Sequence, residues 1–428
     1  MQRIFLFILM LSGLLFSCQR GHKSRMLWNH LSSDFHFPES RGVKAAFIDN
    51  SKGRTLLITT KDESNWVWCT LPAPGNGWYL STRKSIEATF SNIGNSIAKI
   101  LFWVKANKGW DAVVTSATLN PGQRKTLYCN LRDTFPDGTP KISPARVCQI
   151  QVMLVRPRPG TKITVHSLKA TGKTGEWHMP KGRLEVPDLT EEQPEAGKRV
   201  KYQPACMRET KKYIGLYLPT DWKPQHQYPV IVEFPGNIYY TPTCYSSGRP
   251  EACTIGYGIS KGKGAIWISM PFVDKQSDNI IEDGFGNPDY TAQITLETVK
   301  EIVEKYGGDK NNLFIAGFSR GAIACGYIGL RNQKIASLWK GIIACQHYDG
   351  DGWHGANLEG AKKRIKFFKG SYFLVDNNDV QLRNMLEESG VKATFVNSGL
   401  RAHATAMFLD NRPSTLAVRK WFHKLIII

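Results

Sequence analysis

The stretch that decides the fold of the second half of this chain is LFIAGFSRGAIAC, residues 313–325. A short apolar run precedes Gly-x-Ser-x-Gly and small helix-forming residues follow it, so the pattern predicts a strand, a sharp turn and a helix. At such a turn the backbone of Ser319 is strained and its hydroxyl is exposed above the sheet, while Gly317 and Gly321 leave room where strand and helix nearly touch. This context favours a nucleophilic serine over a serine in an ordinary loop.

The sequence around this stretch alternates between strands and helices from about residue 206 to the C-terminus. Residues 290–306 have the apolar period of an amphipathic helix, and short apolar runs stand before and after it. Such alternation predicts a mostly parallel sheet that is covered on both faces. With the serine turn in its middle, the segment 206–428 resembles the α/β-hydrolase family.

This resemblance implies a triad in the chain order serine, acid, histidine. His403 follows the expected strand 391–397 and is the residue expected to accept the proton of Ser319. His423 lies inside the last expected helix, where a basic residue near a helix C-terminus has an ordinary structural explanation. We therefore favour His403.

Two positions compete for the acid. The family's usual place follows the strand 371–376 and offers Asp376 and Asp379, but Asp379 also suits the N-cap of the next helix. Asp349 follows the preceding strand, among His, Tyr, Gly and Trp neighbours that are typical of a site lining. Glucuronoyl esterases, which the Ser-Arg step at 319–320 resembles in part, keep their acid after this earlier strand. We favour Asp349, with Asp379 as the alternative.

The oxyanion hole is expected from two backbone amides. One belongs to Arg320, the residue after the nucleophile, and the other to Asn237, in the loop after the strand 229–234. The Arg320 side chain is a candidate for holding a substrate carboxylate, with a salt bridge on the helix surface as the alternative. Three further residues are candidates for lining the pocket: His347, Trp353 and His354. No zinc-site spacing is present in the sequence, so neither a metal nor another cofactor is expected.

The first half has a different pattern. Short strands alternate with Gly- and Pro-containing turns between residues 31 and 170, which predicts a β-sandwich. The expected strands are 43–48, 54–60, 85–90, 98–104, 124–129, 147–155 and 162–168. The segments 91–96, 101–104 and 119–127 resemble jelly-roll carbohydrate-binding modules of the galactose-binding-like class. Five tryptophans are candidates for stacking on sugar rings, although most of them are expected in the core: Trp66, Trp68, Trp78, Trp103 and Trp110.

The N-terminus predicts export. A short positive start precedes the apolar residues 4–15, which have the length of a signal-peptide core and are too short to span a bilayer. The following Leu-Phe-Ser-Cys resembles a bacterial lipobox, so Cys18 is expected to carry a lipid, with a plain secretory signal as the alternative. The expected location is the bacterial cell envelope, periplasmic or anchored to the outer membrane, and the membrane contact is the lipid.

Export permits disulfides, and Cys244 with Cys253 is the best local pair because the two residues flank a polar loop. The net charge of +20 is concentrated in the first half and attracts polyanions such as acidic polysaccharides. A nucleic-acid partner is not expected, because the sequence carries no nucleic-acid-binding motif.

Together these features predict two domains: a jelly-roll sandwich (31–170) and an α/β hydrolase (206–428), joined by a linker (171–205) and preceded by a signal peptide (1–18) and a tether (19–30). The expected activity is hydrolysis of carboxylic esters, as substituents on a polysaccharide, through an acyl-enzyme on Ser319. The alternatives are a peptidase with the same fold and a non-catalytic glycan-binding lipoprotein on the cell surface.

Overall fold

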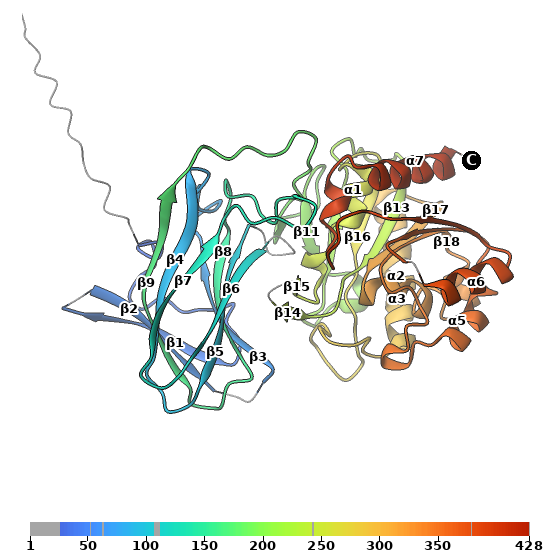
Figure 1. Cartoon of the computed structure of the whole chain (residues 1–428). Helices are drawn as coiled ribbons and strands as arrows, with labels where there is room; N and C mark the ends of the chain where they lie inside the picture. The colour runs from blue at the N-terminus through green and yellow to red at the C-terminus, as the bar shows by residue number, and fades with distance from the viewer. Residues whose placement is uncertain are drawn as a thin grey trace, which may run out of the picture.

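The computed structural model describes residues 26–51, 53–61, 64–106, 112–241, 244–377 and 379–427. Cys18, the predicted signal peptide 1–18, most of the predicted tether and Trp110 lie outside these residues. Within them, a β-sandwich is followed by a mixed sheet that helices cover, and the two parts lie side by side (Figure 1). None of the described helices is both long enough and apolar enough to cross a bilayer.

The sandwich is built from antiparallel strands. The described residues form a five-stranded sheet in the order β1-β2-β9-β4-β7 and a four-stranded sheet in the order β3-β8-β5-β6. The strands are β1 (Val43–Asn50), β2 (Gly53–Thr60), β3 (Trp66–Pro72), β4 (Arg83–Asn92), β5 (Ala98–Lys105), β6 (Ala112–Leu119), β7 (Arg124–Asn130), β8 (Gln149–Val155) and β9 (Lys162–Lys173). In β4 every second side chain from Ile86 onward is buried, because those side chains enter the space between the sheets.

Two of these strands, β3 and β6, are absent from the sequence-based expectation. β6 is an edge strand rich in small and hydroxylated residues, so its apolar alternation is weak. In β3 a run of adjacent residues is buried, because a segment of the second half covers the outer face of its sheet. Neither pattern shows the simple period of two that identifies a strand with one exposed face.

The second sheet has the order β10-β11-β12-β16-β13-β17-β18-β19-β20. From β16 to β20 its neighbours are parallel, whereas β12 is antiparallel to both of its neighbours. The strands are β10 (Leu189–Thr190), β11 (Arg199–Tyr202), β12 (Ile214–Tyr217), β13 (Tyr228–Phe234), β16 (Ile266–Ser269), β17 (Gly308–Phe318), β18 (Trp339–Cys345), β19 (Ser371–Val375) and β20 (Lys392–Val396). The segment expected as a linker, 171–205, thus supplies the end of β9 and two strands of this sheet.

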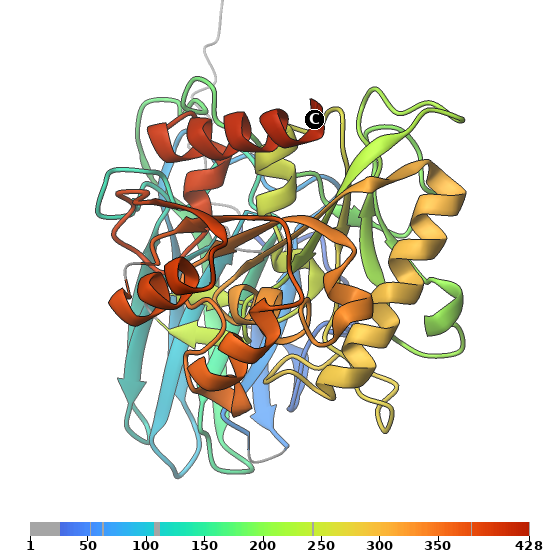
Figure 2. The same cartoon turned by 90° about the vertical axis from the view of Figure 1, so that its right-hand side faces the viewer.

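Helices cover both faces of the second sheet, as the alternating sequence pattern predicts (Figures 1 and 2). One face carries α1 (Ile255–Ser260), η4 (Ala406–Leu409) and α7 (Pro413–Ile427). The other carries α2 (Pro288–Tyr306), α3 (Arg320–Tyr327), α4 (Gln333–Ala336), α5 (Leu358–Ile365) and α6 (Val380–Glu388). The remaining short helices are η1 (Ala205–Met207), η2 (Pro250–Ala252) and η3 (Trp353–Gly355). This arrangement agrees with the predicted α/β class.

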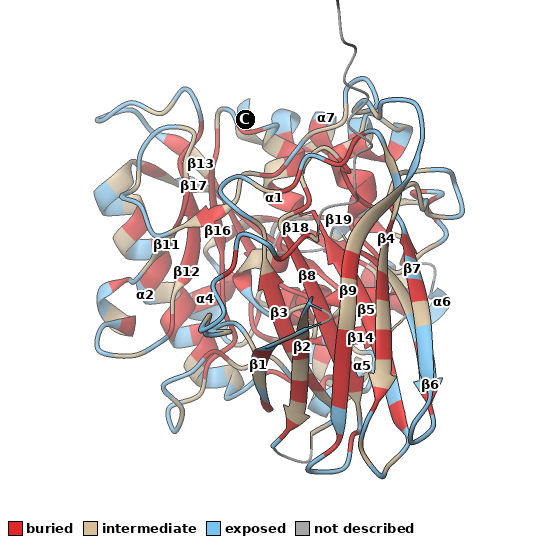
Figure 3. Cartoon of the chain, turned by 90° about the vertical axis from the view of Figure 1, so that its left-hand side faces the viewer, coloured by how far each residue is buried: buried red, intermediate tan, exposed pale blue. Residues whose placement is uncertain are grey.

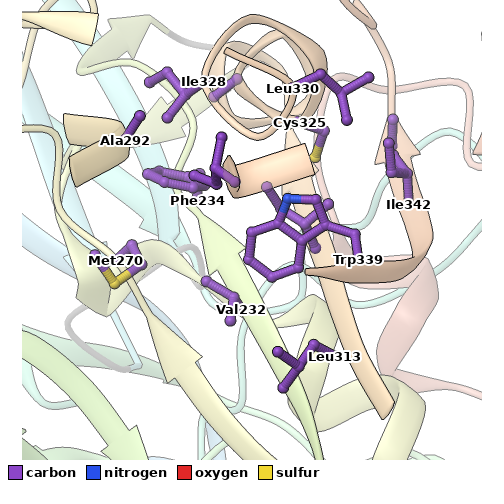
Figure 4. Packing of buried hydrophobic residues seen from close by; sticks show 14 of the residues in the cluster. Val232, Phe234, Met270, Ala292, Leu313, Cys325, Ile328, Leu330, Trp339 and Ile342 are labelled. Atoms are coloured by element: carbon purple, nitrogen blue, oxygen red, sulfur yellow. The ribbon is translucent and has the colours of Figure 1, made fainter. Parts of the chain in front are cut away.

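The central strands of this sheet are buried on both faces, which is why they read as continuous apolar runs. Side chains of β13, β17 and β18 pack with those of α2 and α3; Val232 and Leu313 lie near each other, and Ile342 lies on the far side of Trp339 from them (Figure 4). Buried positions run through the middle of both halves (Figure 3). The carboxyl ends of these rigid strands position the loops described below.

The predicted disulfide between Cys244 and Cys253 is not formed, because both residues are free cysteines. Cys253 is buried, and its thiol faces the carbonyl oxygen of Glu233 at 3.7 Å. Cys244 begins the strand β15 (Cys244–Ser246), which pairs with β14 (Tyr239–Thr241). The polar loop between the cysteines is therefore ordered by strand pairing and by η2 instead of by a covalent link.

The β14–β15 hairpin joins the two halves. Tyr240 lies with its ring centroid 5.7 Å from that of Trp66, 5.5 Å from that of Trp68 and 6.2 Å from that of Trp103. Trp103 is buried in this cluster, and Trp78 is buried in the core of the sandwich. The hairpin thus covers part of the outer face of the four-stranded sheet. Trp103 lies beneath it and Trp78 lies in the sandwich core, so neither is an exposed platform for sugar rings.

We expect Tyr240→Ala to lower the free energy of unfolding by about 3 to 5 kcal/mol, because it leaves a cavity among several aromatic rings. Urea denaturation followed by tryptophan fluorescence measures this change. Tyr128→Ala is the matched control, since Tyr128 is 56% exposed on the sandwich surface, and we expect it to cost less than about 1 kcal/mol. Equal, small effects for both variants would mean that the hairpin does not pack on the sandwich.

Candidate active site

Ser319 lies on the turn between β17 and α3. Its backbone has φ of 54° and ψ of −119°, a combination that residues with a side chain rarely adopt. A Cβ on Gly321 would lie 2.0 Å from the carbonyl oxygen of Phe234, and one on Gly317 would lie 2.1 Å from that of Gly321. Only glycine fits at these two positions, and the close packing of strand and helix holds the strained serine in place.

His403 reaches Ser319 from the loop after β20. Its Nε2 atom lies 3.0 Å from Ser319 Oγ, a distance at which the hydroxyl donates to a neutral imidazole. The loop is fixed by Gln346, whose Nε2 donates to the carbonyl oxygen of Ala402 at 3.1 Å, and the imidazole packs on the ring of Phe318 at 4.6 Å. The structure therefore brings together the two residues that the sequence pairs.

The surroundings of His403 keep it neutral. Burial, and to a smaller extent the nearby His347, lowers the pKa of this imidazole from 6.5 to about 4. The two ring centroids lie 5.3 Å apart. At neutral pH His403 is therefore unprotonated and free to accept the proton of Ser319, but the imidazolium that would form is poorly stabilised.

Asp349, which the sequence favours as the acid, does not contact His403. Its buried carboxylate accepts hydrogen bonds from Arg364, at 2.9 and 2.7 Å from Nη2 and at 3.1 Å from Nε. Burial raises the pKa of Asp349 to about 6, although Arg364 opposes this shift. A Cβ on Gly326 of α3 would lie 2.5 Å from the Asp349 Cβ, so this aspartate packs against α3 and pairs with α5. The prediction that Asp349 orients His403 is contradicted.

The alternative acid has a structural role too. Asp379 caps α6, because its Oδ1 accepts from the amide of Leu382 at 2.8 Å. Asp376 accepts from the amide and the hydroxyl of Ser398 at 2.7 and 2.5 Å. Both aspartates line a cavity of about 790 Å³ that His403 also lines. Among the described residues no carboxylate is hydrogen-bonded to His403, so the site in this structure is a serine–histidine dyad.

The Arg320 side chain is buried behind the site instead of facing a substrate. Its guanidinium donates at 2.8 to 3.3 Å to five backbone carbonyl oxygens, those of Gly236, Gly248, Ile281, Glu282 and Gly284. It also stacks 3.9 Å from the centroid of the Phe272 ring. Burial lowers the pKa of Arg320 to about 9. Both predictions for this side chain, substrate carboxylate binding and a surface salt bridge, are wrong. The side chain instead donates hydrogen bonds to three loops at once.

The two amides predicted for the oxyanion hole are free. The backbone N–H groups of Arg320 and Asn237 have no hydrogen-bond partner within the described residues. Arg320 is the first residue of α3, so its amide has no acceptor inside the helix. The Asn237 side chain is fixed, because it accepts from the amide of Gly284 at 3.0 Å and donates to Asp283 at 2.7 Å. Both amides therefore remain available for an oxyanion.

Ser319 opens into a cavity of about 460 Å³. Of the predicted lining residues, His347 and Trp353 line this cavity, whereas His354 packs on Trp353 with ring centroids 4.2 Å apart. Tyr239 and Cys244 of the hairpin line it as well and were not predicted. The sequence signal for them is that they directly follow the loop that carries Asn237, which we call the oxyanion loop. Across the described part of the chain, no group of His, Cys, Asp and Glu side chains is arranged to hold a metal ion.

Comparisons with known proteins give distant likenesses. No family model and no curated protein matches the sequence. Among solved structures, the chain is similar to a family 11 carbohydrate-binding module from Clostridium thermocellum in complex with a mixed-linked tetrasaccharide, with 18% identity over 31% of this chain and 83% of the module and a TM-score of 0.25.

Two solved hydrolases are similar over longer parts of the chain. A thermostable esterase is 13% identical over 80% of this chain and 96% of its own, with a TM-score of 0.36. Dipeptidyl peptidase 4 of Porphyromonas gingivalis is 13% identical over 54% of this chain and 35% of its own, with a TM-score of 0.37. All these likenesses are distant, and they do not by themselves assign a function to this chain.

We expect the rate at which a fluorophosphonate labels Ser319 to fall as the pH drops through about 4, because His403 accepts protons only when it is neutral. His347→Ala removes a neighbour that lowers the pKa of His403, so the inflexion of the rate–pH curve moves to higher pH. His423→Ala, in the exposed last turn of α7, is the control and leaves the pH of the inflexion unchanged. Labelling that already fails near pH 6.5 in the unmodified protein would contradict this account.

The same pKa affects stability. Since the folded value of about 4 lies below the unfolded value of 6.5, protonation of His403 destabilises the fold as the pH falls from 6.5 toward 4. Circular dichroism at each pH therefore accompanies the labelling measurement, so that the rate is taken from folded protein only.

We expect Asp349→Asn to lower the free energy of unfolding by about 3 kcal/mol or more, because it leaves Arg364 without its buried partner. The labelling rate of the folded variant should stay within about twofold of the unmodified protein, since Asp349 does not touch His403. Asp289→Asn, which breaks the exposed ion pair with Arg331, is the control and should lower the free energy of unfolding by less than about 1 kcal/mol. A folded Asp349→Asn protein that labels far more slowly would restore Asp349 as the acid.

Proposed function

We propose that this chain is a serine esterase that removes ester substituents from a polysaccharide. The observation that carries the proposal is the 3.0 Å contact between Ser319 Oγ and His403 Nε2, on a strained turn beside two free backbone amides. A nucleophile, a base within hydrogen-bond reach and oxyanion donors are the parts that acyl transfer requires.

In the acylation step, Ser319 Oγ attacks the ester carbonyl carbon while its proton moves to His403 Nε2. The carbonyl oxygen becomes an oxyanion that accepts hydrogen bonds from the amides of Arg320 and Asn237. When this tetrahedral intermediate collapses, the bond to the alkoxy oxygen breaks and His403 returns the proton to the departing alcohol. The acyl group is then bonded to Ser319.

Deacylation repeats these steps with water. His403 Nε2 accepts a proton from a water molecule, whose oxygen attacks the acyl carbon, and the same two amides stabilise the second oxyanion. The bond between Ser319 Oγ and the acyl carbon breaks, and Oγ takes the proton back from His403. The products are a carboxylic acid and the free enzyme.

The electrostatics of His403 favour esters over amides. No described carboxylate stabilises the imidazolium, and burial disfavours that charged form. Loss of such a carboxylate costs a protease about 10⁴ in rate. An alcohol is a better leaving group than an amine, so ester cleavage tolerates a weakly stabilised imidazolium more readily than peptide cleavage does.

A polysaccharide is the proposed carrier of the ester because aromatic side chains surround the nucleophile. Tyr239 and Trp353 line the cavity at Ser319, and flat rings of this kind suit the C–H faces of sugars. The predicted resemblance of the first half to carbohydrate-binding modules supports the same substrate class. The proposed place of action is outside the cytoplasm, on the strength of the lipobox-like sequence that ends at Cys18.

We expect Ser319→Ala to abolish release of acetate from an acetylated xylan and from p-nitrophenyl acetate, with a fall in kcat of about 10⁴ or more. Ser337→Ala, on the short helix-to-strand connection before β18, is the control and retains full activity. Mass spectrometry of fluorophosphonate-treated protein should find the label on Ser319 alone. Cleavage of peptide substrates without release of acetate would contradict the esterase proposal, and full activity of Ser319→Ala would contradict the nucleophile.

A further inference from the structure

A second cavity, of about 890 Å³, lies between the sandwich and the mixed sheet. Tyr240 and Tyr245 of the β14–β15 hairpin line it, while Tyr239 and Cys244 of the same hairpin line the cavity at Ser319. The hairpin therefore forms a shared wall between the two cavities. We call this second cavity the interface cleft.

The floor of the interface cleft carries buried polar side chains that lack full partners. Lys105 is 2% exposed, donates to the hydroxyl of Tyr245 and lies 4.0 Å from the centroid of that ring. Gln151 is 3% exposed, and its Oε1 atom has no hydrogen-bond partner within the described residues. Its Nε2 reaches only Thr70 Oγ1, at 3.4 Å. A buried polar atom without a partner is rare, so Gln151 Oε1 is a candidate acceptor for a hydroxyl group bound in the cleft.

Positive charge exceeds negative charge on the wall of the interface cleft. Arg41 and Arg249 share one carboxylate, that of Glu282, at 2.6 and 2.5 Å. Lys211 and Lys105 form no ion pair among the described residues, although Glu39 and Glu251 also line the cleft and Glu39 opposes the effect of burial on the pKa of Lys105. Burial lowers the pKa of Lys105 to about 7, which an anion bound nearby would oppose by favouring the charged ammonium.

We propose that the interface cleft binds an anionic sugar residue of a polysaccharide, with its carboxylate or sulfate near Lys105 and a hydroxyl at Gln151 Oε1. The ring of Trp68 is partly exposed and lines the cleft, where it can contact the apolar face of a pyranose. A planar amide, a buried cation and an aromatic ring together suit a charged saccharide better than a free inorganic anion. This site differs from the one at Ser319, and the inference does not depend on esterase activity.

The cleft is also connected to the catalytic loops. The side chain of Glu282 receives Arg41 and Arg249 at the cleft wall, while its backbone carbonyl accepts from Arg320 at 2.9 Å. A saccharide held in the cleft would therefore lie beside the segment that fixes the oxyanion loop, one hairpin away from Ser319.

The test is isothermal titration calorimetry of the full chain carrying Ser319→Ala, so that no ligand is consumed. The probes are trigalacturonate, a sulfated galactotriose and neutral galactotriose. We expect at least one of the two anionic probes to bind at least tenfold more tightly than the neutral one, because a buried charge-assisted hydrogen bond is worth about a tenfold change in affinity or more. Whichever anionic probe binds identifies the charged group as carboxylate or sulfate.

Two variants in the same background locate the site. Lys105→Met keeps an unbranched side chain, shorter by the terminal ammonium, and removes the charge, and it should weaken binding of the anionic probe about tenfold or more. Lys211→Ala, at the exposed wall of the cleft, should weaken it less and without affecting the fold. Lys366→Ala, at the exposed end of α5, is the control with a lysine elsewhere on the surface and should bind as before.

Equal affinity for the neutral and anionic probes would overturn the proposal, as would binding by a folded Lys105→Met protein that matches the control. If Lys105→Met fails to fold, an unchanged affinity in Lys211→Ala together with Gln151→Leu would overturn it instead. Absence of any binding would overturn it as well. None of these outcomes depends on Ser319, so they leave the proposed esterase activity to its own test.

Discussion

The guanidinium of Arg320 holds the candidate active site together. It is buried, and it donates to carbonyl oxygens from three separate loops, at Gly236, Gly248 and the segment 281–284. Glu282 also accepts from the amide of Ile238 at 2.9 Å, but the other four carbonyls have Arg320 as their only donor among the described residues, so the loops depend on this side chain. The next residue toward the N-terminus is the strained Ser319, and one of the three loops carries Asn237. A single residue thus fixes the loops around the nucleophile through its side chain and offers an oxyanion donor through its backbone.

The β14–β15 hairpin, which follows the oxyanion loop, connects the active-site loops to the sandwich. Its Tyr240 lies among the tryptophans of the sandwich, while Tyr239 on the neighbouring position lines the cavity at Ser319. The sandwich is therefore more than an appended module, because it supports one wall of the catalytic cavity. The same packing buries aromatic side chains on the outer face of the four-stranded sheet, and a cleft with polar walls lies beside them.

Local sequence patterns were enough to predict part of the candidate site and the fold class of the second half. The turn at Ser319 is encoded by neighbouring residues, since two glycines at fixed spacing are needed for strand and helix to approach. His403 was predictable because it follows a recognisable strand, and the carboxyl ends of parallel strands lie at one edge of the sheet. The alternation of strands and helices likewise indicated the class of the second half.

The remaining features depend on partners that are distant in the sequence. Asp349 was misjudged because Arg364, on a later helix, takes its carboxylate. Arg320 was misjudged because its acceptors are backbone carbonyls, which leave no trace in the residue pattern. The strand β3 was missed because a hairpin from the other half buries its outer face. In each case the structure depends on tertiary contacts that the local sequence pattern does not show.

The central claim is that the Ser319 hydroxyl faces the imidazole of His403 and the amides of Arg320 and Asn237 at once. The most direct measurement is a crystal structure of the protein after reaction with diethyl p-nitrophenyl phosphate. The account predicts a phosphoryl group on Ser319 Oγ, with its free oxygen within about 3 Å of both amide nitrogens. An unmodified Ser319, or a phosphoryl oxygen directed away from both amides, would contradict it.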